Sequence, residues 1–276
     1  MSVTTSSERA GVARAFAAAR AGGRAALVPY VTAGHPSPAE TPAVLRMLAA
    51  EGADVIELGV PFSDPLADGP TIQRSSFQAI GQGADLPWTL SVLSGFRREH
   101  DTPVVLFTYL NPVLHYGLER FLEDAVAAGA DAVLLTDLPV GADPAIERAV
   151  DESGLDLIRL VAPTTTPERV REIARAARGF LYYVSRTGVT GAQQDLSAGL
   201  AREVEEVRAV TDVPVAVGFG ISTPGQAAAV ARIADGVVVG SALVDALGRG
   251  GVEAGRAFVR SLRAAVDSAA ASANLH

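Results

Sequence analysis

The chain has 276 residues, of which 49% are hydrophobic, and this is enough for one large hydrophobic core. Its formal net charge is −8, which argues against nucleic acid as a main partner. All 23 basic residues are arginine and cysteine is absent, which excludes a lysine Schiff base, a thiolate nucleophile and a disulfide. No apolar run reaches the ~20 residues of a membrane span and no secretion signal is recognisable, so we expect a cytoplasmic protein.

The four histidines are scattered and show no spacing typical of a His-based metal site. We therefore expect no His-ligated metal, although an all-carboxylate Mg²⁺ site stays open. Because pyridoxal phosphate also needs a lysine, we expect no cofactor in this chain.

Strand-like runs alternate with helix-like runs along the whole chain. The first 25 residues predict a short helix that uses Val12 and Phe16 to close one end of the fold. Strands are predicted at 26–32, 55–58, 104–109, 132–136, 157–161, 180–185, 215–218 and 236–239. Helices are predicted at 38–50, 71–80, 87–99, 118–128, 144–152, 167–177 and 224–233, and from about residues 197 and 252. The tail from 267 to 276 is small and polar, and we expect it to fray.

The predicted strands are mostly continuous apolar runs, which is typical of parallel strands buried on both faces. Several helices are expected to begin with a proline that follows Ser, Thr or Asp, at Pro38, Pro144, Pro167 and Pro224. Eight such strand–helix units predict an α/β protein, a single (β/α)₈ TIM barrel over residues 1–276 with an extra N-terminal helix. A doubly wound open sheet is the alternative.

The second predicted strand carries an acid, Glu57, in the middle of a short apolar run. A charge in such a run is costly unless it is partnered or neutralised. The loop that follows brings Asp64 and Asp68, and a strand-borne acid with acids close behind it resembles an active site at the carboxyl end of a barrel strand. The alternative is that Glu57 pairs with an arginine of a neighbouring strand and only ties the core together.

Three loops after consecutive strands are rich in glycine, at 185–191, 218–224 and 239–244. Glycines let backbone amides approach an anion, and the helix that follows adds its positive end. These loops therefore predict a phosphate site. Aromatic residues also gather at strand ends, at Tyr30, Phe107, Tyr109, Tyr182 and Phe219. Each alone is expected in a core, but together at one mouth they would form a flat slot for an aromatic substrate.

The stretch from Asp54 to Ile72 reads DVIELGVPFSDPLADGPTI and closely resembles the signature of the tryptophan synthase alpha chain family. Matching blocks follow in the same order from about Leu27 to Leu247. The resemblance favours the barrel over the open sheet. It implies the reversible retro-aldol cleavage of indole-3-glycerol phosphate to indole and glyceraldehyde 3-phosphate, in tryptophan biosynthesis. One departure is His35, which stands where the family usually has aspartate.

The residue inventory fits that lyase reaction. Without lysine or a His-ligated metal, the substrate must be its own electron sink, and indole is one once its C3 is protonated. Glu57 is the candidate acid at C3, and Asp68 would accept a hydrogen bond from the ring N–H. The resemblance implies that the remaining substrate contacts are Tyr30, Tyr109, Tyr182, Thr190, Gly191, Phe219, Gly220, Gly240 and Ser241.

The resemblance also implies a beta subunit as partner, in an α₂β₂ heterotetramer in which pyridoxal phosphate belongs to the beta chain alone. Two segments match the family's interface, Phe62-Ser63-Asp64-Pro65 and Asn111-Pro112-Val113. The loop at 186–194 and the Asp68 loop are expected to close over the substrate. Two other functions stay open: a stand-alone indole-3-glycerol-phosphate lyase, and a mainly regulatory phosphosugar-binding barrel subunit.

Overall fold

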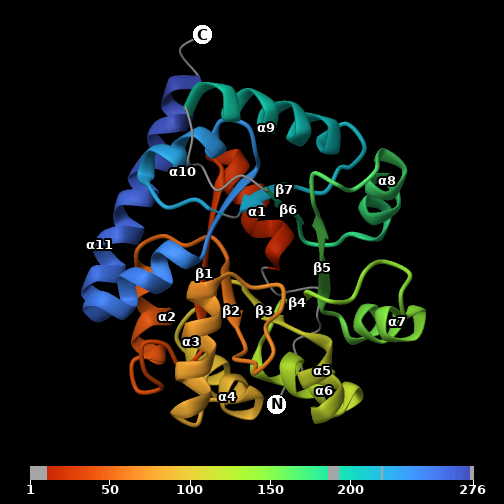
Figure 1. Cartoon of the computed structure of the whole chain (residues 1–276), viewed down its shortest axis with the longest axis vertical. Helices are drawn as coiled ribbons and strands as arrows, with labels where there is room; N and C mark the ends of the chain where they lie inside the picture. The colour runs from red at the N-terminus through yellow and green to blue at the C-terminus, as the bar shows by residue number, and fades with distance from the viewer. Residues whose placement is uncertain (1–10, 186–192, 219, 274–276) are drawn as a thin grey trace.

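The computed structural model describes residues 11–185, 193–218 and 220–273, with the side chains of 193–198 and 270–273 left out. In these ranges eight parallel strands close into a barrel in the order β1 to β8 (Figure 1). The strands are β1 (Ala26–Thr32), β2 (Ile56–Gly59), β3 (Val104–Thr108), β4 (Ala132–Leu135), β5 (Asp156–Val161), β6 (Leu181–Val184), β7 (Val215–Gly218) and β8 (Gly236–Val239). The predicted TIM barrel is confirmed, and the open sheet is wrong because β1 pairs with β8.

Helices surround the barrel (Figure 1). They are α1 (Val12–Ala21), α2 (Thr41–Ala50), α3 (Pro70–Gly81), α4 (Leu86–Phe96), α5 (Leu110–Tyr116), α6 (Leu118–Ala128), α7 (Pro144–Ser153), α8 (Pro167–Ala176), α9 (Gln193–Arg208), α10 (Pro224–Ala231) and α11 (Ser241–Ala273). No helix in the described ranges is long and apolar enough to cross a membrane.

The helices differ from the sequence-based prediction in several places. Pro38 lies in a turn, and α2 begins at Thr41, with Pro42 in its first turn. The short helix α5 was not predicted. The tail after residue 266 was expected to fray, yet α11 continues to Ala273 with Ala269 buried. Its non-helical residues Gly250 and Gly251 divide α11 into two helical stretches, and the second begins at about the predicted residue 252.

The strands are buried on both faces, as their continuous apolar runs predicted. One set of side chains faces the helices, and the alternate set fills the barrel interior, where Val28, Val105, Leu134, Ile158 and Val238 pack together. This alternation decides which residue of each strand can reach the space enclosed by the barrel.

Helix α1 closes the end of the barrel at which the strands begin. Phe16 stacks on Phe180 with ring centroids 5.2 Å apart. Gly236 leaves room for Phe16, because a Cβ at that position would lie 2.7 Å from the ring. The enclosed space is therefore filled at this end and opens at the carboxyl ends of the strands.

Aspartates at strand starts fix the pairing of neighbouring strands at this same end. Asp54 accepts a hydrogen bond from the amide of Leu27 at 2.8 Å, and Asp131 accepts one from Val104 at 2.9 Å. Each carboxylate is also paired with arginine, Asp54 with Arg24 among others. Both aspartates end a Gly-Ala-Asp turn, at residues 52–54 and 129–131, and this repeated turn has a structural role at the end of the barrel opposite the carboxyl ends of the strands.

Candidate active site

A cavity of about 410 Å³ lies at the carboxyl ends of the strands. Its walls come from strands on all sides of the barrel and from the loops after β2, β7 and β8. The predicted site residues among its lining are Tyr30, Glu57, Asp68, Tyr182, Gly220, Gly240 and Ser241. Residues far apart in the chain are therefore brought to one space, at the end of the fold where TIM-barrel enzymes bind substrates.

Glu57 lies in the middle of β2, between Tyr30 of β1 and Val105 of β3 in the strand register. Its side chain is 1% exposed, and the buried oxygen Oε1 has no hydrogen-bond partner among the described residues. None of the described arginines forms an ion pair with Glu57. The alternative that Glu57 only ties the core together required such a pair and is therefore not supported. Burial without a partner raises the pKa of Glu57 to about 8, so the carboxyl group is protonated at neutral pH.

Asp68 faces the same cavity from the loop between β2 and α3. Burial raises the pKa of Asp68 to about 6, and a hydrogen bond with Tyr109 partly opposes that rise. Tyr109 also accepts a hydrogen bond from the amide of Ala67 at 3.0 Å. At neutral pH the site therefore combines a protonated Glu57 with an ionised Asp68, two carboxyl groups suited to different tasks.

Tyr109 has a different place from the one that the sequence suggested. It was expected beside the aromatic substrate, but it is absent from the described lining of the cavity. Its ring packs against Phe62, with centroids 5.2 Å apart, and its hydroxyl group holds the Asp68 loop. The structure thus assigns Tyr109 to the support of Asp68.

Two tyrosines and a phenylalanine form the apolar part of the cavity. Tyr30 meets Phe107 edge-on, with ring centroids 5.2 Å apart, and Tyr182 lies across the barrel on β6. Gly59 and Gly218 make room for the tyrosine rings. A Cβ at Gly59 would lie 2.2 Å from the hydroxyl oxygen of Tyr30, and one at Gly218 would lie 2.4 Å from that of Tyr182.

A chain of buried hydroxyl groups fixes Tyr30. Ser75 donates to the carbonyl of Ile72 at 2.8 Å, so it accepts from Thr32 at 2.7 Å. Thr32 in turn accepts from Tyr30 at 3.3 Å. These hydrogen bonds connect β1 to the first turns of α3, which follow Asp68 in the sequence. They therefore orient the ring of Tyr30 relative to Asp68.

The loops after β7 and β8 form the polar end of the cavity. Gly220 has φ +79°, a conformation that favours glycine, and it lines the cavity with Ile221 and Ser222. The capping box of α10 engages the amides of Ser222 and Thr223, which both donate to Gln226 Oε1. Helix α11 begins directly at the cavity with Ser241, so its first amides and its positive end face the space where an anion would lie.

Three predicted contacts, Thr190, Gly191 and Phe219, lie outside the described residues, as does Arg186. Other lining residues were not singled out from the sequence, among them Thr136 on the β4–α7 connection and Leu160 on β5. Leu160 has no acid or run of glycines beside it, and Thr136 is followed only by Asp137, whose side chain accepts a hydrogen bond from the amide of Leu110. These two lining residues could have been predicted from the alternation of side chains along a strand, which directs every second residue into the barrel.

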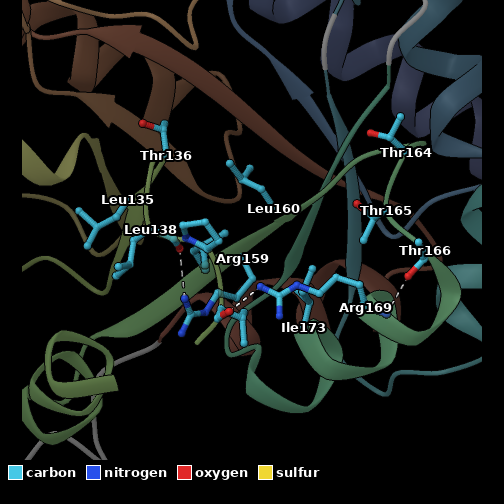
Figure 2. Close-up of a pocket in the computed structure, with 13 residues that line it drawn as sticks. Leu135, Thr136, Leu138, Arg159, Leu160, Thr164, Thr165, Thr166, Arg169 and Ile173 are labelled. Atoms are coloured by element: carbon cyan, nitrogen blue, oxygen red, sulfur yellow. Dashed lines mark hydrogen bonds between the residues drawn. The ribbon is translucent and has the colours of Figure 1, made fainter. Parts of the chain in front are cut away.

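A second cavity, of about 390 Å³, lies between β5 and helix α8 (Figure 2). Arg159 of β5 and Arg169 of α8 extend into it, and both donate to carbonyl groups of the β4–α7 loop, at Leu138 and Val140. Each arginine is also paired with a glutamate. Because these charges are already matched, the second cavity has no acid–base pair comparable to that of the first.

No group of three or more His, Cys, Asp or Glu residues that could hold a metal ion is present in the part of the chain that the structure describes.

Comparison with known proteins assigns the family. A model of the tryptophan synthase alpha chain matches residues 16–273. The alpha chain of Geobacter sulfurreducens is 51% identical over 259 residues, 92% of this chain and 98% of that protein. That of Acidiphilium cryptum is 48% identical over 95% of each chain.

Solved structures agree with this assignment. Tryptophan synthase subunit alpha from Legionella pneumophila superposes with a TM-score of 0.86 at 38% identity, over 93% of this chain and 98% of the other. An aminoacrylate-bound tryptophan synthase from M. tuberculosis superposes with a TM-score of 0.84 at 39% identity, over 92% and 98%. Sequence and fold agree, and the chain belongs to the tryptophan synthase alpha chain family.

Proposed function

We propose that Glu57 and Asp68 carry the reaction of this family, the reversible retro-aldol cleavage of indole-3-glycerol phosphate to indole and glyceraldehyde 3-phosphate. The observation that carries the proposal is the pair of carboxyl groups facing one cavity, with the pKa of Glu57 at about 8 and that of Asp68 at about 6. Between these values one group is an acid and the other an anion, and the cleavage requires both.

In the proposed reaction, Glu57 donates its proton to C3 of the indole ring. The resulting carboxylate takes the proton of the hydroxyl group next to the scissile carbon–carbon bond. That bond then breaks, its electron pair returns to the ring as indole forms, and the former alcohol carbon becomes the aldehyde of glyceraldehyde 3-phosphate. Asp68 accepts a hydrogen bond from the ring N–H, and its charge offsets the positive charge that develops on the protonated ring.

The substrate would lie along the cavity with its ring at the aromatic end. Tyr30, Phe107 and Tyr182 supply apolar surface for the indole. The phosphate would lie at Gly220, Gly240 and Ser241, where backbone amides and the start of α11 face it. The family resemblance implies that Thr190 and Phe219 would also contact the indole ring and that Gly191 would also contact the phosphate.

We also propose that the chain works without a cofactor of its own and pairs with a beta subunit that holds pyridoxal phosphate, in a cytoplasmic α₂β₂ assembly. Two large apolar side chains are exposed on the segments that directly follow β2 and β3. Leu66, in the Asp68 loop, is 90% exposed, and Leu114, on α5, is 50% exposed. Both are neighbours of the interface segments suggested by the sequence, in which Pro65 and Val113 are themselves buried.

The test is an assay of the purified chain for indole release from indole-3-glycerol phosphate, with and without a beta subunit and after exhaustive chelation. We expect slow release from the chain alone, faster turnover with the beta subunit, and no effect of chelation. Full activity alone that a beta subunit leaves unchanged would indicate the stand-alone lyase, and no cleavage under any condition would indicate a regulatory subunit. Loss of activity on chelation with recovery on adding a divalent ion would contradict the proposed chemistry.

A further inference from the structure

His35, in the loop after β1, contacts the helix that begins at the polar end of the cavity. Its side chain is 7% exposed, and Nε2 lies 3.0 Å from the carbonyl oxygen of Val244 in α11. Because a carbonyl oxygen only accepts, Nε2 carries the proton and donates. Gly248, one turn further along α11, leaves room for the ring, since a Cβ there would lie 3.2 Å from Nε2. His35 thus lies against the first two turns of α11.

The same loop is held to the rest of the barrel by its backbone. The amide of His35 donates to the carbonyl of Thr32 at 3.1 Å, and the amide of Gly34 donates to Thr41 Oγ1 at 2.9 Å. The imidazole therefore extends from a fixed position, and its hydrogen bond ties the first turn of α11 to β1.

That first turn is the one whose start lines the cavity. The amides of Leu243 and Val244 both donate to the carbonyl of Gly240, at 2.9 and 3.0 Å, so Gly240 to Val244 form one closed turn. The side chain of Val244 is buried beside Tyr30 and Ile72. A shift of Val244 would therefore move the amides of Gly240 and Ser241 and disturb the packing of Tyr30.

We propose that His35 is a positioning residue for phosphate: by holding the carbonyl of Val244 it fixes the amides at the start of α11 in the geometry that binds the phosphate group. This inference rests on the proposed function, which assigns the phosphate to Gly240 and Ser241. A side chain that only accepts hydrogen bonds, such as an ionised carboxylate, could not make this contact. The contact with Val244 therefore depends on the N–H group that the histidine supplies.

The test compares His35→Leu, which fills the space but cannot donate, with His35→Gln, whose side-chain amide can reach the position of Nε2. Loss of one neutral hydrogen bond should raise the dissociation constant for inorganic phosphate, and the KM for indole-3-glycerol phosphate, about three- to tenfold. The value of kcat should change less than twofold, a split that loss of folded protein alone does not produce. His35→Gln should restore most of the phosphate affinity.

Thr41→Val is the matched control. It removes a buried hydrogen bond to Gly34 in the same loop, and Thr41 is 1% exposed, but its hydroxyl group is hydrogen-bonded to Gly34 and Ser37 and not to α11. The control should lower the melting temperature while phosphate affinity falls much less than in His35→Leu, because the amide of His35 still donates to Thr32 and the imidazole still donates to Val244. Equal loss of phosphate affinity in Thr41→Val and His35→Leu would overturn the inference, because the effect would then reflect general loosening of the loop.

Gly240→Val separates this inference from the proposed function. If wild-type protein binds phosphate no better than Gly240→Val, the phosphate site itself is wrong and the inference falls with it. A second outcome is that wild-type protein binds phosphate, Gly240→Val fails to bind it, and His35→Leu binds it as tightly as the wild type. In that case the phosphate site is supported and the proposed role of His35 is overturned.

Discussion

At the scale of single residues, the environment of Glu57 favours the proposed acid over a residue that only ties the core together. A core-bracing glutamate would be ionised and paired with arginine, whereas Glu57 is buried with an oxygen that has no partner in the described part of the chain. A neutral carboxyl group of this kind contributes little to holding strands together, and it retains a proton that it can donate.

Glu57→Gln keeps the shape of the side chain but cannot exchange the proton. We expect cleavage to fall by at least the ~10²–10⁴-fold usual for a general acid–base group, with substrate affinity nearly unchanged because the phosphate loops are intact. Single-turnover cleavage, calorimetry and thermal unfolding of one preparation would measure this. A folded variant that binds substrate and cleaves it at the wild-type rate would remove Glu57 from the mechanism.

The two pKa values predict the pH dependence of activity. The ratio kcat/KM should decline below about pH 6, where Asp68 becomes protonated and loses its charge, and above about pH 8, where Glu57 loses its proton. Asp68→Asn should lower activity throughout and abolish the acidic limb of the profile. A flat profile between pH 5 and about pH 9 for the wild-type chain would contradict the assignment of both groups.

The raised pKa of Glu57 also makes the free energy of unfolding depend on pH. The pKa of Glu57 rises from 4.5 in the unfolded chain to about 8 in the fold, so below pH 4.5 both states hold the proton and no penalty arises. Between pH 4.5 and about pH 8 the unfolded chain has released the proton of Glu57 while the folded chain still holds it. The free energy of unfolding therefore declines as pH rises through this range, by about 5 kcal/mol in total once pH 8 is passed. Denaturant unfolding should therefore show Glu57→Gln gaining stability over wild type across this range. Parallel pH curves for the two proteins would contradict a buried, neutral Glu57.

At the scale of secondary-structure elements, the two helices after β7 and β8 start differently. Helix α10 has a capping box that engages the amides of the preceding turn, whereas α11 begins with Gly240 and Ser241 at the cavity. The start of α11 is therefore the better anion site of the two, and the size of its first residues limits how closely an anion can approach.

Gly240→Val tests that difference. A Cβ at Gly240 would already lie 3.5 Å from Tyr30, and the larger valine would occupy space needed by the phosphate. We expect glycerol 3-phosphate to bind at least tenfold more weakly in calorimetry, about 1.4 kcal/mol, while an unphosphorylated indole ligand loses much less. Gly225→Ala, in α10 with open space around it, is the control and should leave both affinities unchanged. Equal losses for the two ligands would contradict the phosphate assignment.

At the scale of the whole molecule, the barrel is closed at one end and presents apolar side chains around the other. Helix α1 fills the end where the strands begin, and the loop that brings Ala67 and Asp68 to the cavity also exposes Leu66. An exposed leucine in the loop that carries Asp68 gives a docked partner a direct means of changing the position of that acid. Partner binding and loop closure should therefore be coupled.

Leu66→Ser should weaken the beta subunit's binding and reduce its activation of cleavage. Leu66 is 90% exposed in the free chain, so the loss should arise from the lost contact and leave the folding stability of the chain unchanged. Phe77→Ser on α3, which removes another exposed apolar side chain, is the control and should leave beta affinity unchanged. Light scattering of mixtures and activity titrations would measure both effects, and a Leu66→Ser chain that binds and responds as wild type does would exclude Leu66 from the interface.

The sequence by itself determined the barrel and the order of its elements, and it indicated several residues that the fold brings to one cavity. Continuous apolar runs indicated strands buried on both faces, and prolines indicated the starts of α7, α8 and α10. An acid inside an apolar strand indicated Glu57, and glycine-rich loops indicated the anion end. These signals are readable because burial on both faces, helix starts and close backbone approach each restrict residue type locally.

Only the tertiary structure decided what surrounds each of these residues. It left Glu57 without an arginine partner among the described residues, directed Tyr109 toward Asp68, formed α5 where a loop was expected, and fitted Gly59 against Tyr30. Such features depend on side chains that strands and loops distant in the chain bring together. The pKa of a carboxyl group follows from how much water and how many partners remain around it, and that surrounding exists only once the barrel has closed.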